Sequence, residues 1–206
     1  FVLFKFSIFL MEEIMNKKLK GTKTEQNLIN SFAGEAQARN RYTYYSKIAK
    51  DEGYEQIAEI FLSTSENELE HAKLFYKHLA NNPLGHVDAF YPYEIGTTED
   101  NLISAISGET EEFDVLYKEA EQIAKDEGFE AIANTFHNVR NSEEHHAKRY
   151  KELLKNLKEG TLFLKNSEEM WICRKCGYVH RGKSAPEHCP NCLHPQGYFQ
   201  LLCEKY

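Results

Sequence analysis

Cysteine is absent from most of this sequence, and its distribution gives the first indication of the chemistry. The chain has five cysteines, and all of them lie between Cys173 and Cys203. Four of them form two Cys-x-x-Cys pairs, which are Cys173/Cys176 and Cys189/Cys192. This spacing is typical of a metal site rather than of a disulfide framework. The pattern therefore indicates a metal-binding protein of a reducing cytoplasm.

Long apolar segments and an excess of basic residues are also missing. The apolar residues 1–10 are too few for a membrane span, which needs about 20 residues, and no secretory cleavage site follows them. Met15 and the residues after it resemble a bacterial start, so residues 1–14 are expected to be an upstream leader or a disordered arm. The net charge of -7 argues against nucleic acid as the main partner, because phosphate binding needs a basic surface. We therefore expect a cytoplasmic protein that binds neither membranes nor nucleic acid.

An internal repeat organises the first three quarters of the chain. The repeat contains the segments KDEGY at 50–54 and KDEGF at 125–129, which are 75 positions apart. Upstream, Gly34-Glu35 returns as Gly108-Glu109 after 74 positions. Each copy is rich in Ala, Glu, Lys and Leu, has apolar residues at helical spacing, and has a glycine where its first helix should end. The repeat predicts two helical hairpins, with helices near 23–51, 54–80, 100–126 and 129–158.

The segment between the two hairpins predicts the topology. Residues 81–99 contain Pro83, Pro92 and two glycines, so the segment is not helical and is much longer than a turn requires. An extended link of this length reaches about 60 Å, whereas a helix of 26 residues is about 39 Å long. The link can therefore cross the full length of a bundle. The predicted fold class is mainly α, a ferritin-like four-helix bundle with a small C-terminal four-cysteine metal domain.

Acidic side chains fall at one level of this predicted bundle. At 1.5 Å per residue, five glutamates lie about 22 to 29 Å from the hairpin turns. Two histidines, His71 and His146, follow three residues after two of these glutamates, one helical turn along the same face. The glutamates are Glu35, Glu68, Glu109, Glu112 and Glu143.

A metal centre explains this constellation better than a solvated surface does. Any single glutamate in a chain with 32 acidic residues would ordinarily be a surface residue. Two in-register copies, with each Glu-x-x-His at the same distance from its turn, are hard to obtain on a solvated face. An apolar interior does not tolerate four or five unpaired carboxylates, but two bound cations would supply the missing charge. Carboxylate oxygens and imidazole nitrogens both suit iron.

At these residues the chain resembles the rubrerythrin family, from about Met15 to Phe199. The resemblance implies that Glu35 is a terminal ligand of one iron, and that Glu109 and His146 are terminal ligands of the other. It implies that Glu68 and Glu143 bridge the two irons. It also implies that Glu112 binds one iron in the oxidised state and yields it to His71 in the reduced state. Tyr42 and Tyr117 would lie near the bridging carboxylates.

The cysteine pairs form the second predicted metal site. A segment of roughly 40 residues cannot bury enough surface to fold without a metal. Four thiolates suit either zinc or iron, and spacing alone favours zinc. Behind a di-iron bundle, however, the segment resembles a rubredoxin domain, which implies one iron held by Cys173, Cys176, Cys189 and Cys192. Cys203 lies outside this frame and is expected to be a spare thiol.

The resemblance implies a peroxidase that reduces hydrogen peroxide to water. Electrons would enter through the four-cysteine iron from a reductase that draws on NADH, or from a rubredoxin. The expected domains are a bundle at 15–165 and a rubredoxin-like domain at 166–206, in a homodimer or larger homo-oligomer. One alternative is a ferroxidase or iron-storage protein, which would not need the cysteine module. A pure electron carrier or a zinc ribbon is another, and it would leave the bundle ligands without a purpose.

Overall fold

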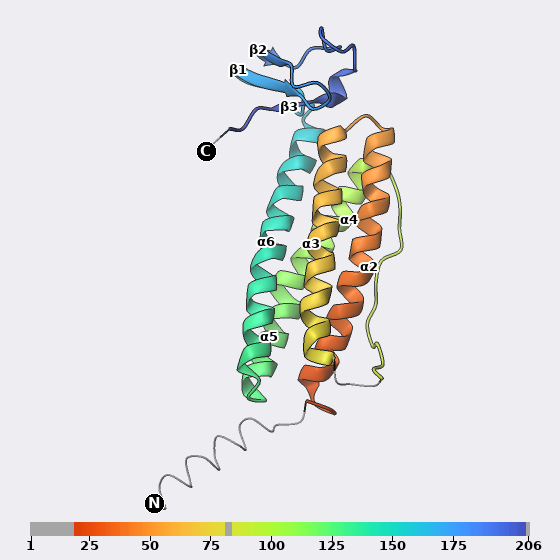
Figure 1. Ribbon diagram of the computed structural model, residues 1–206, viewed down its shortest axis with the longest axis vertical. Coiled ribbons are helices and arrows are strands. Elements are labelled where there is room, and N and C mark those ends of the chain that lie inside the picture. The colour runs from red at the N-terminus through yellow and green to blue at the C-terminus, as the bar shows by residue number, and fades with distance from the viewer. Residues whose placement is uncertain (1–18, 81–83, 205–206) are drawn as a thin grey trace, which may run out of the picture.

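The computed structural model describes residues 19–80 and 84–204. The expected leader or arm at 1–14 lies outside the described residues. Within them, long antiparallel helices form a bundle with a small sheet at one end (Figure 1). The described helices include none that is both long enough and apolar enough to cross a bilayer. The predicted fold class, a ferritin-like bundle with a four-cysteine module, is confirmed.

The helices follow the hairpins that the repeat predicts. The first hairpin pairs α2 (Lys23–Asp51) with α3 (Glu55–Leu79). The second pairs a helix that begins as α4 (Thr98–Glu111) and ends as α5 (Tyr117–Asp126) with α6 (Glu130–Lys158). The observed ends of the helices lie within two residues of the predicted ends, because the residues that start and stop a helix act locally.

Capping residues fix these ends. Thr22 begins α2 by accepting a hydrogen bond from the backbone N–H of Glu25, and Thr97 with Asp100 forms a capping box at α4. Gly53 and Gly128 have φ of +86° and +77°, respectively, which is the left-handed conformation that ends a helix at the lowest steric cost. Each hairpin therefore turns at the glycine that the repeat marks.

The first helix of the second hairpin is not a continuous α-helix. Between α4 and α5 the chain forms a π-helical segment, η1 (Glu112–Leu116). The prediction of a single helix over 100–126 missed this interruption. A π-segment accommodates one extra residue, and the repeat offset changes from 74 at Glu109 to 75 at Tyr117, so one residue has been inserted between them. The η1 segment absorbs this insertion, so the residues after it return to the helix face that the repeat predicts.

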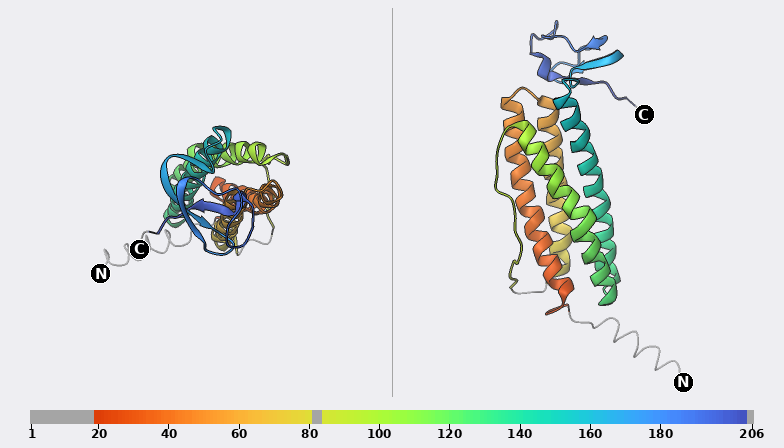
Figure 2. Two further views of the ribbon diagram at one scale, coloured as in Figure 1. Left: turned by 90° about the horizontal axis from the view of Figure 1, so that it is seen from above. Right: turned by 180° about the vertical axis from the view of Figure 1, so that it is seen from behind.

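The link between the hairpins runs along the outside of the bundle (Figures 1 and 2). Asn30 holds it there, because its side chain donates to the carbonyl of Asp88 at 2.9 Å and accepts from the N–H of Asp88 at 3.0 Å. The hydroxyl of Tyr91 donates to the carbonyl of Asn30 at 2.8 Å. The long link thus joins the second hairpin to the first as a ferritin-like crossover.

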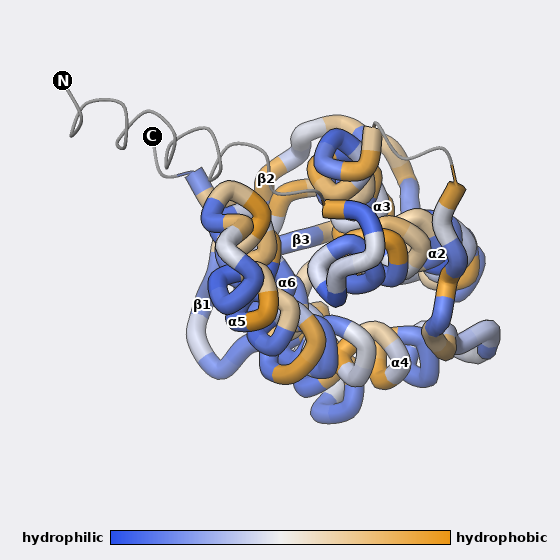
Figure 3. The backbone as a smooth tube through the Cα atoms, turned by 90° about the horizontal axis from the view of Figure 1, so that it is seen from below, coloured by the Kyte–Doolittle hydropathy of each residue, from blue (hydrophilic) through white to orange (hydrophobic). Residues whose placement is uncertain are grey.

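Aromatic side chains fill the bundle above and below its middle. One cluster, towards the sheet, contains Tyr42, Tyr45, Phe61 and Tyr150, and the other contains Phe75, Tyr117 and Phe136. Hydrophobic and hydrophilic positions alternate along the turns of each helix, as amphipathic helices require (Figure 3). The two clusters leave a polar layer between them.

The C-terminal residues form an antiparallel sheet of strand order β2-β1-β3. Its strands are β1 (Leu164–Cys173), β2 (Val179–Ser184) and β3 (Phe199–Leu201), with a short 3-10 turn, η2 (Gln196–Tyr198), before β3. Trp171 is fully buried between β2 and β3, and its indole N–H donates to the carbonyl of Gly182 at 2.9 Å. Because β1 already begins at Leu164, the boundary expected between 165 and 166 falls inside a strand.

The sheet module packs on the α2–α3 turn through a glycine contact. A Cβ at Gly197 would lie 1.9 Å from the carbonyl oxygen of Gly53, so only glycine fits at this contact. Arg174 adds an ion pair with Glu59 on α3 and a hydrogen bond with Gln200. The module is therefore positioned by backbone contact as well as by charge.

Gly197→Ala should separate the module from the bundle without touching any candidate metal ligand. Forcing one methyl group into a packed contact typically costs about 1 to 3 kcal/mol. We expect faster protease cleavage between α6 and β1 and a lower melting temperature for the module, measured by limited proteolysis and calorimetry. Ser167→Ala, at an exposed position of β1, is the control. Unchanged cleavage in Gly197→Ala would show that the glycine contact does not hold the module.

Candidate metal centres

The polar layer of the bundle contains six of the seven side chains that the sequence predicted to be ligands of the bundle metal site. They come from all four helices and form two groups of four that share Glu68 and Glu143. Glu35 and His71 complete one group, and Glu109 and His146 complete the other. In each group the potential ligand atoms lie within 4.8 Å of one another. The geometry is that of two adjacent metal positions with two shared carboxylates.

Each shared glutamate presents one oxygen to each imidazole. Nδ1 of His71 lies 2.8 Å from Oε2 of Glu68 and 2.8 Å from Oε1 of Glu143. Nδ1 of His146 lies 2.8 Å from Oε2 of Glu143 and 3.3 Å from Oε1 of Glu68. Nδ1 of His146 is also 3.4 Å from Oε2 of Glu109. Glu68 and Glu143 are therefore placed to bridge two cations.

The site is buried, and its polar atoms lack the partners that burial requires. The four carboxylates are at most 1% exposed, and the two imidazoles at most 8%. Seven carboxylate and imidazole atoms that face one another, together with the second oxygen of Glu109, have no hydrogen-bond partner among the described residues. Native proteins rarely leave so many buried polar atoms unsatisfied. Two hard cations would satisfy them, so these residues fit a di-iron centre.

Without metal, the groups hold protons that the metals would replace. Burial and the charge of Glu68 raise the pKa of Glu109 to about 8, and burial together with Glu143 raises that of Glu35. Burial alone would lower the pKa of His71, but the adjacent carboxylates of Glu143 and Glu68 raise it to about 10. Burial likewise opposes the rise at His146, where the carboxylates of Glu109, Glu143 and Glu68 bring the pKa to about 12.

Glu112 is the nominated residue that the structure keeps apart. It belongs to neither group of four, and it is half-buried at the start of η1. Its Oε1 lies 3.9 Å from the point where a Cβ at Gly34 would be. The carboxylate lines a cavity of about 350 Å³ between α2, the crossover and α5. His71 therefore lies within the candidate metal site, whereas Glu112 lies outside it, in the lining of the cavity.

The two tyrosines contact different carboxylates from those expected. The hydroxyl of Tyr42 donates to Glu109 at 2.5 Å, and that of Tyr117 donates to Glu35 at 2.5 Å. The expectation placed them near the shared pair Glu68 and Glu143. Each tyrosine instead reaches from one repeat to the outer carboxylate of the other, and so fixes the orientation of that carboxylate.

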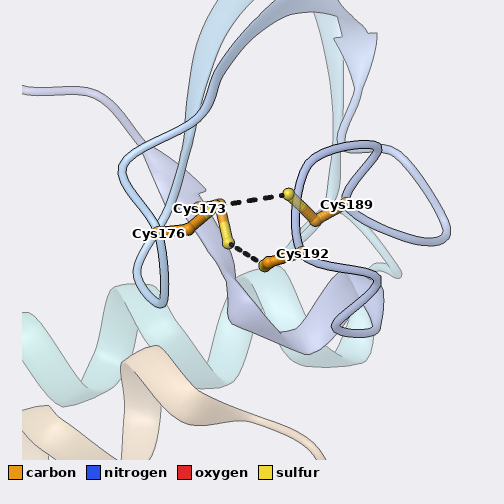
Figure 4. Close-up of side chains that lie close together, drawn as sticks. All are labelled: Cys173, Cys176, Cys189 and Cys192. Carbon is orange, nitrogen blue, oxygen red and sulfur yellow. Dashed lines mark hydrogen bonds between the residues drawn. The ribbon is translucent and has the colours of Figure 1, made fainter.

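The four cysteines converge at the loops of the sheet module (Figure 4). Their sulfurs lie within 4.8 Å of one another, with Cys173 and Cys192 at 3.8 Å and Cys176 and Cys189 at 3.6 Å. Four sulfurs placed 2.3 Å from one central metal at the corners of a tetrahedron are about 3.8 Å apart. A hydrogen bond from the Asn191 side chain lowers the pKa of Cys176 to about 6, which favours the thiolate that a metal binds.

Sequence reasoning missed the residues that surround Glu112. These are Gly34, Arg41 and Tyr91, which line the same cavity. A signal for the unusual geometry was present, because the change of repeat offset between Glu109 and Tyr117 marks the inserted residue. No sequence signal indicated that Arg41 would be buried there.

Comparisons with known proteins agree with both sites. The family model described as rubrerythrin matches residues 26–154, and that of the rubrerythrin rubredoxin-like domain matches 171–200. Rubrerythrin-1 of Clostridium acetobutylicum is 50% identical over 194 residues, which cover 92% of this chain and 100% of that protein. Rubrerythrin of Nitratidesulfovibrio vulgaris is 46% identical, covering 90% and 97%. A solved structure of nigerythrin in a mixed-valence state has a TM-score of 0.60 at 30% identity, covering 91% and 90%.

Metal loading of the bundle should release protons. At pH 7 the metal-free His71 and His146 are charged and Glu109 is protonated, because their pKa values lie above 7. Burial raises the pKa of Glu35, which shifts it towards its protonated form as well. Ligation removes these protons, so three or more should be released, and ferrous affinity should fall as the pH decreases below about 8. Anaerobic titration in weak buffer with a pH indicator measures this, on protein whose four-cysteine site already holds zinc.

Two variants make that measurement specific. Glu109→Gln should reduce the release by about one proton, since the amide has no proton to lose at this pH. Glu144→Gln removes an exposed glutamate that pairs with Lys148 and should leave the release unchanged. Metal binding without any proton release would contradict the protonated state assigned to the empty site.

Proposed function

Because this chain belongs to the rubrerythrin family and matches both its rubrerythrin and its rubredoxin-like domain, we propose that it reduces hydrogen peroxide to water. Family membership makes it an oxidoreductase, and iron is its cofactor at both sites. The proposal goes further in naming the oxidant, the product and the electron route. Its main support is the presence of a buried carboxylate–histidine site and a tetrathiolate site in one chain.

We assign the ligands from the geometry. Glu68 and Glu143 would be shared by the two irons, and His71 and His146 would each bind one of them. Glu35 completes the position of His71, and Glu109 completes that of His146. The four cysteines hold the third iron. We further propose that the bundle and the rubredoxin-like module are separate domains that meet between α6 and β1.

The reaction needs two electrons and two protons for each peroxide that becomes two waters. When bound, the di-iron centre supplies the two electrons. The chain's own contribution is to exclude bulk water with the two aromatic clusters and to orient the carboxylates of the site. Tyr42 and Tyr117 hold the outer carboxylates in place. Glu35 and Glu109 lose their protons when they bind metal, so the two protons of the reaction come from solvent.

The cavity beside Glu112 gives a small neutral oxidant a way in. It has a volume of about 350 Å³ and is lined by Glu112 and Tyr117 on the side of the metal cluster. Peroxide is small enough to enter and carries no charge that the surrounding carboxylates would repel. In this proposal Glu112 replaces His71 as a ligand on oxidation, because a carboxylate suits ferric iron better than imidazole does.

The partner of this reaction is an electron-donating protein, either an NADH-linked reductase or a rubredoxin. Glu68 lies 15 residues after Gly53, a rise of roughly 22 Å along α3. The four-cysteine site at the α2–α3 turn is therefore far from the carboxylates of its own chain. A homodimer in which each cysteine site faces the partner's bundle would shorten the path. We place the protein in the cytoplasm, where its thiols stay reduced.

Glu112→Ala tests the ligand exchange. The reduced centre should keep both irons, because six ligands remain, whereas the oxidised centre should lose roughly 10- to 100-fold in iron affinity. Iron retention is measured before and after one equivalent of peroxide. Glu144→Ala, at an exposed position of α6 outside that cavity, is the control. Equal retention and unchanged peroxide kinetics would shift the assignment towards a ferroxidase.

Removing the cysteine module should leave a single turnover but abolish cycling. The chain is cut after Leu162, because Leu162 packs on the bundle core whereas Phe163 packs on Trp171. The reduced fragment should be oxidised by one equivalent of peroxide as fast as the whole chain. It should then accept electrons from a reductase and NADH far more slowly.

A matched control is the full chain with zinc in the four-cysteine site, which keeps the fold but cannot carry an electron. It should stop after one turnover, as the fragment does. If either protein cycles at the full rate, electrons do not enter through the cysteines. If the reduced whole chain reacts no faster with peroxide than with oxygen, the ferroxidase function replaces the peroxidase one.

A further inference from the structure

Arg41 is buried beside the metal layer without a partner that explains it. Its side chain is 7% exposed, and its Nε and Nη1 atoms have no hydrogen-bond partner in the described part of the chain. The guanidinium carbon lies 5.6 Å from the centre of the Tyr42 ring. A buried arginine normally forms hydrogen-bonded ion pairs, because desolvation of its charge is costly. This arginine lines the cavity that contains Glu112.

Two glycines lie next to these two side chains. A Cβ at Gly34 would lie 3.9 Å from Oε1 of Glu112, and a Cβ at Gly108 would lie 3.7 Å from Nη2 of Arg41. Gly34 and Gly108 occupy equivalent places in the two repeats, each directly before an outer carboxylate. Equivalent places in the two repeats therefore lie next to Glu112 in the first copy and next to Arg41 in the second.

The charges around the cavity decide what Arg41 attracts. Its lining contains one basic side chain, Arg41, and four carboxylates, those of Asp88, Glu111, Glu112 and Glu119. A free anion would be repelled by this acidic surrounding, so the cavity is a poor anion site. Glu112 is the half-buried carboxylate of the cavity, and hence the one that most needs a counter-charge.

We propose that Arg41 supplies the positive charge that favours the cavity position of the Glu112 carboxylate whenever it is not a metal ligand. Arg41 is then a positioning residue, which acts on the metal centre through Glu112. Its charge stabilises the withdrawn carboxylate and leaves the metal position to His71. This inference rests on the ligand exchange in the proposed function, and it adds the group that sets the balance between the two positions.

The first test observes where Glu112 lies, independently of activity. Zinc in the bundle imitates the divalent, reduced centre and cannot change oxidation state. In a crystal structure of the dizinc protein, Glu112 should lie in the cavity. In dizinc Arg41→Gln it should lie on the metal, with His71 displaced. A Glu112 that stays in the cavity in Arg41→Gln overturns the proposal.

The second test measures the reduction potential of the di-iron centre. Arg41→Gln should lower the equilibrium constant for reduction about tenfold, which corresponds to about 59 mV for a one-electron step, because the oxidised state already has Glu112 on the metal. Loss of a positive charge would also lower the potential through space, so the same change is made in a Glu112→Gln background. There the shift should be much smaller. Equal shifts in both backgrounds would mean that Arg41 acts directly on the irons and would refute the proposal.

Controls separate charge from folding and from catalysis. Arg41→Lys keeps the charge and should keep the native potential, and Arg41→Met replaces Arg41→Gln if the amide does not fold. Arg39→Gln removes a half-exposed arginine two residues away, 4.0 Å from Glu66, and should change neither readout. If Glu112 moves as expected while the iron protein does not reduce peroxide, the peroxidase function fails and the positioning role of Arg41 stands.

Discussion

The burial of four carboxylates and two imidazoles in the middle of a helical bundle is the constraint on which the rest of the structure depends. Unpaired charges at this depth would cost several kcal/mol each, so the layer must hold either protons or metal ions. The aromatic clusters on both sides remove water and make that requirement strict. The same apolar walls that would destabilise the empty charged site therefore make it a strong binder of cations.

The internal repeat explains how this layer is built. Glu68 and Glu143 come from equivalent positions of the repeat and offer one oxygen to each imidazole. Tyr42 and Tyr117 cross between the repeats to fix Glu109 and Glu35. A structure built from two copies thus produces two metal positions with common bridging ligands.

The function we propose depends on the place where the symmetry breaks. One inserted residue would rotate everything after it by about 100° on an α-helix, because a turn contains 3.6 residues. The η1 segment absorbs the insertion, so Tyr117 returns to register while Glu112 is displaced towards the cavity. One metal position therefore has two candidate ligands, His71 in the cluster and Glu112 beside Arg41. The other has no such alternative among the described residues.

The approximate helix ends, the four-cysteine site and the set of acidic and histidine residues at mid-bundle could all be predicted from the sequence. Periodicity, glycine stops and repeat spacing are local or translational signals, and they fix the height of each residue along the bundle. They do not fix which neighbour a side chain meets across it. The crossed contacts of Tyr42 and Tyr117, the withdrawn Glu112 and the contact of Gly197 with Gly53 were decided only by the tertiary structure. Arg41 is the clearest case, since nothing in a helix rich in charged residues indicates which arginine will be buried without a partner.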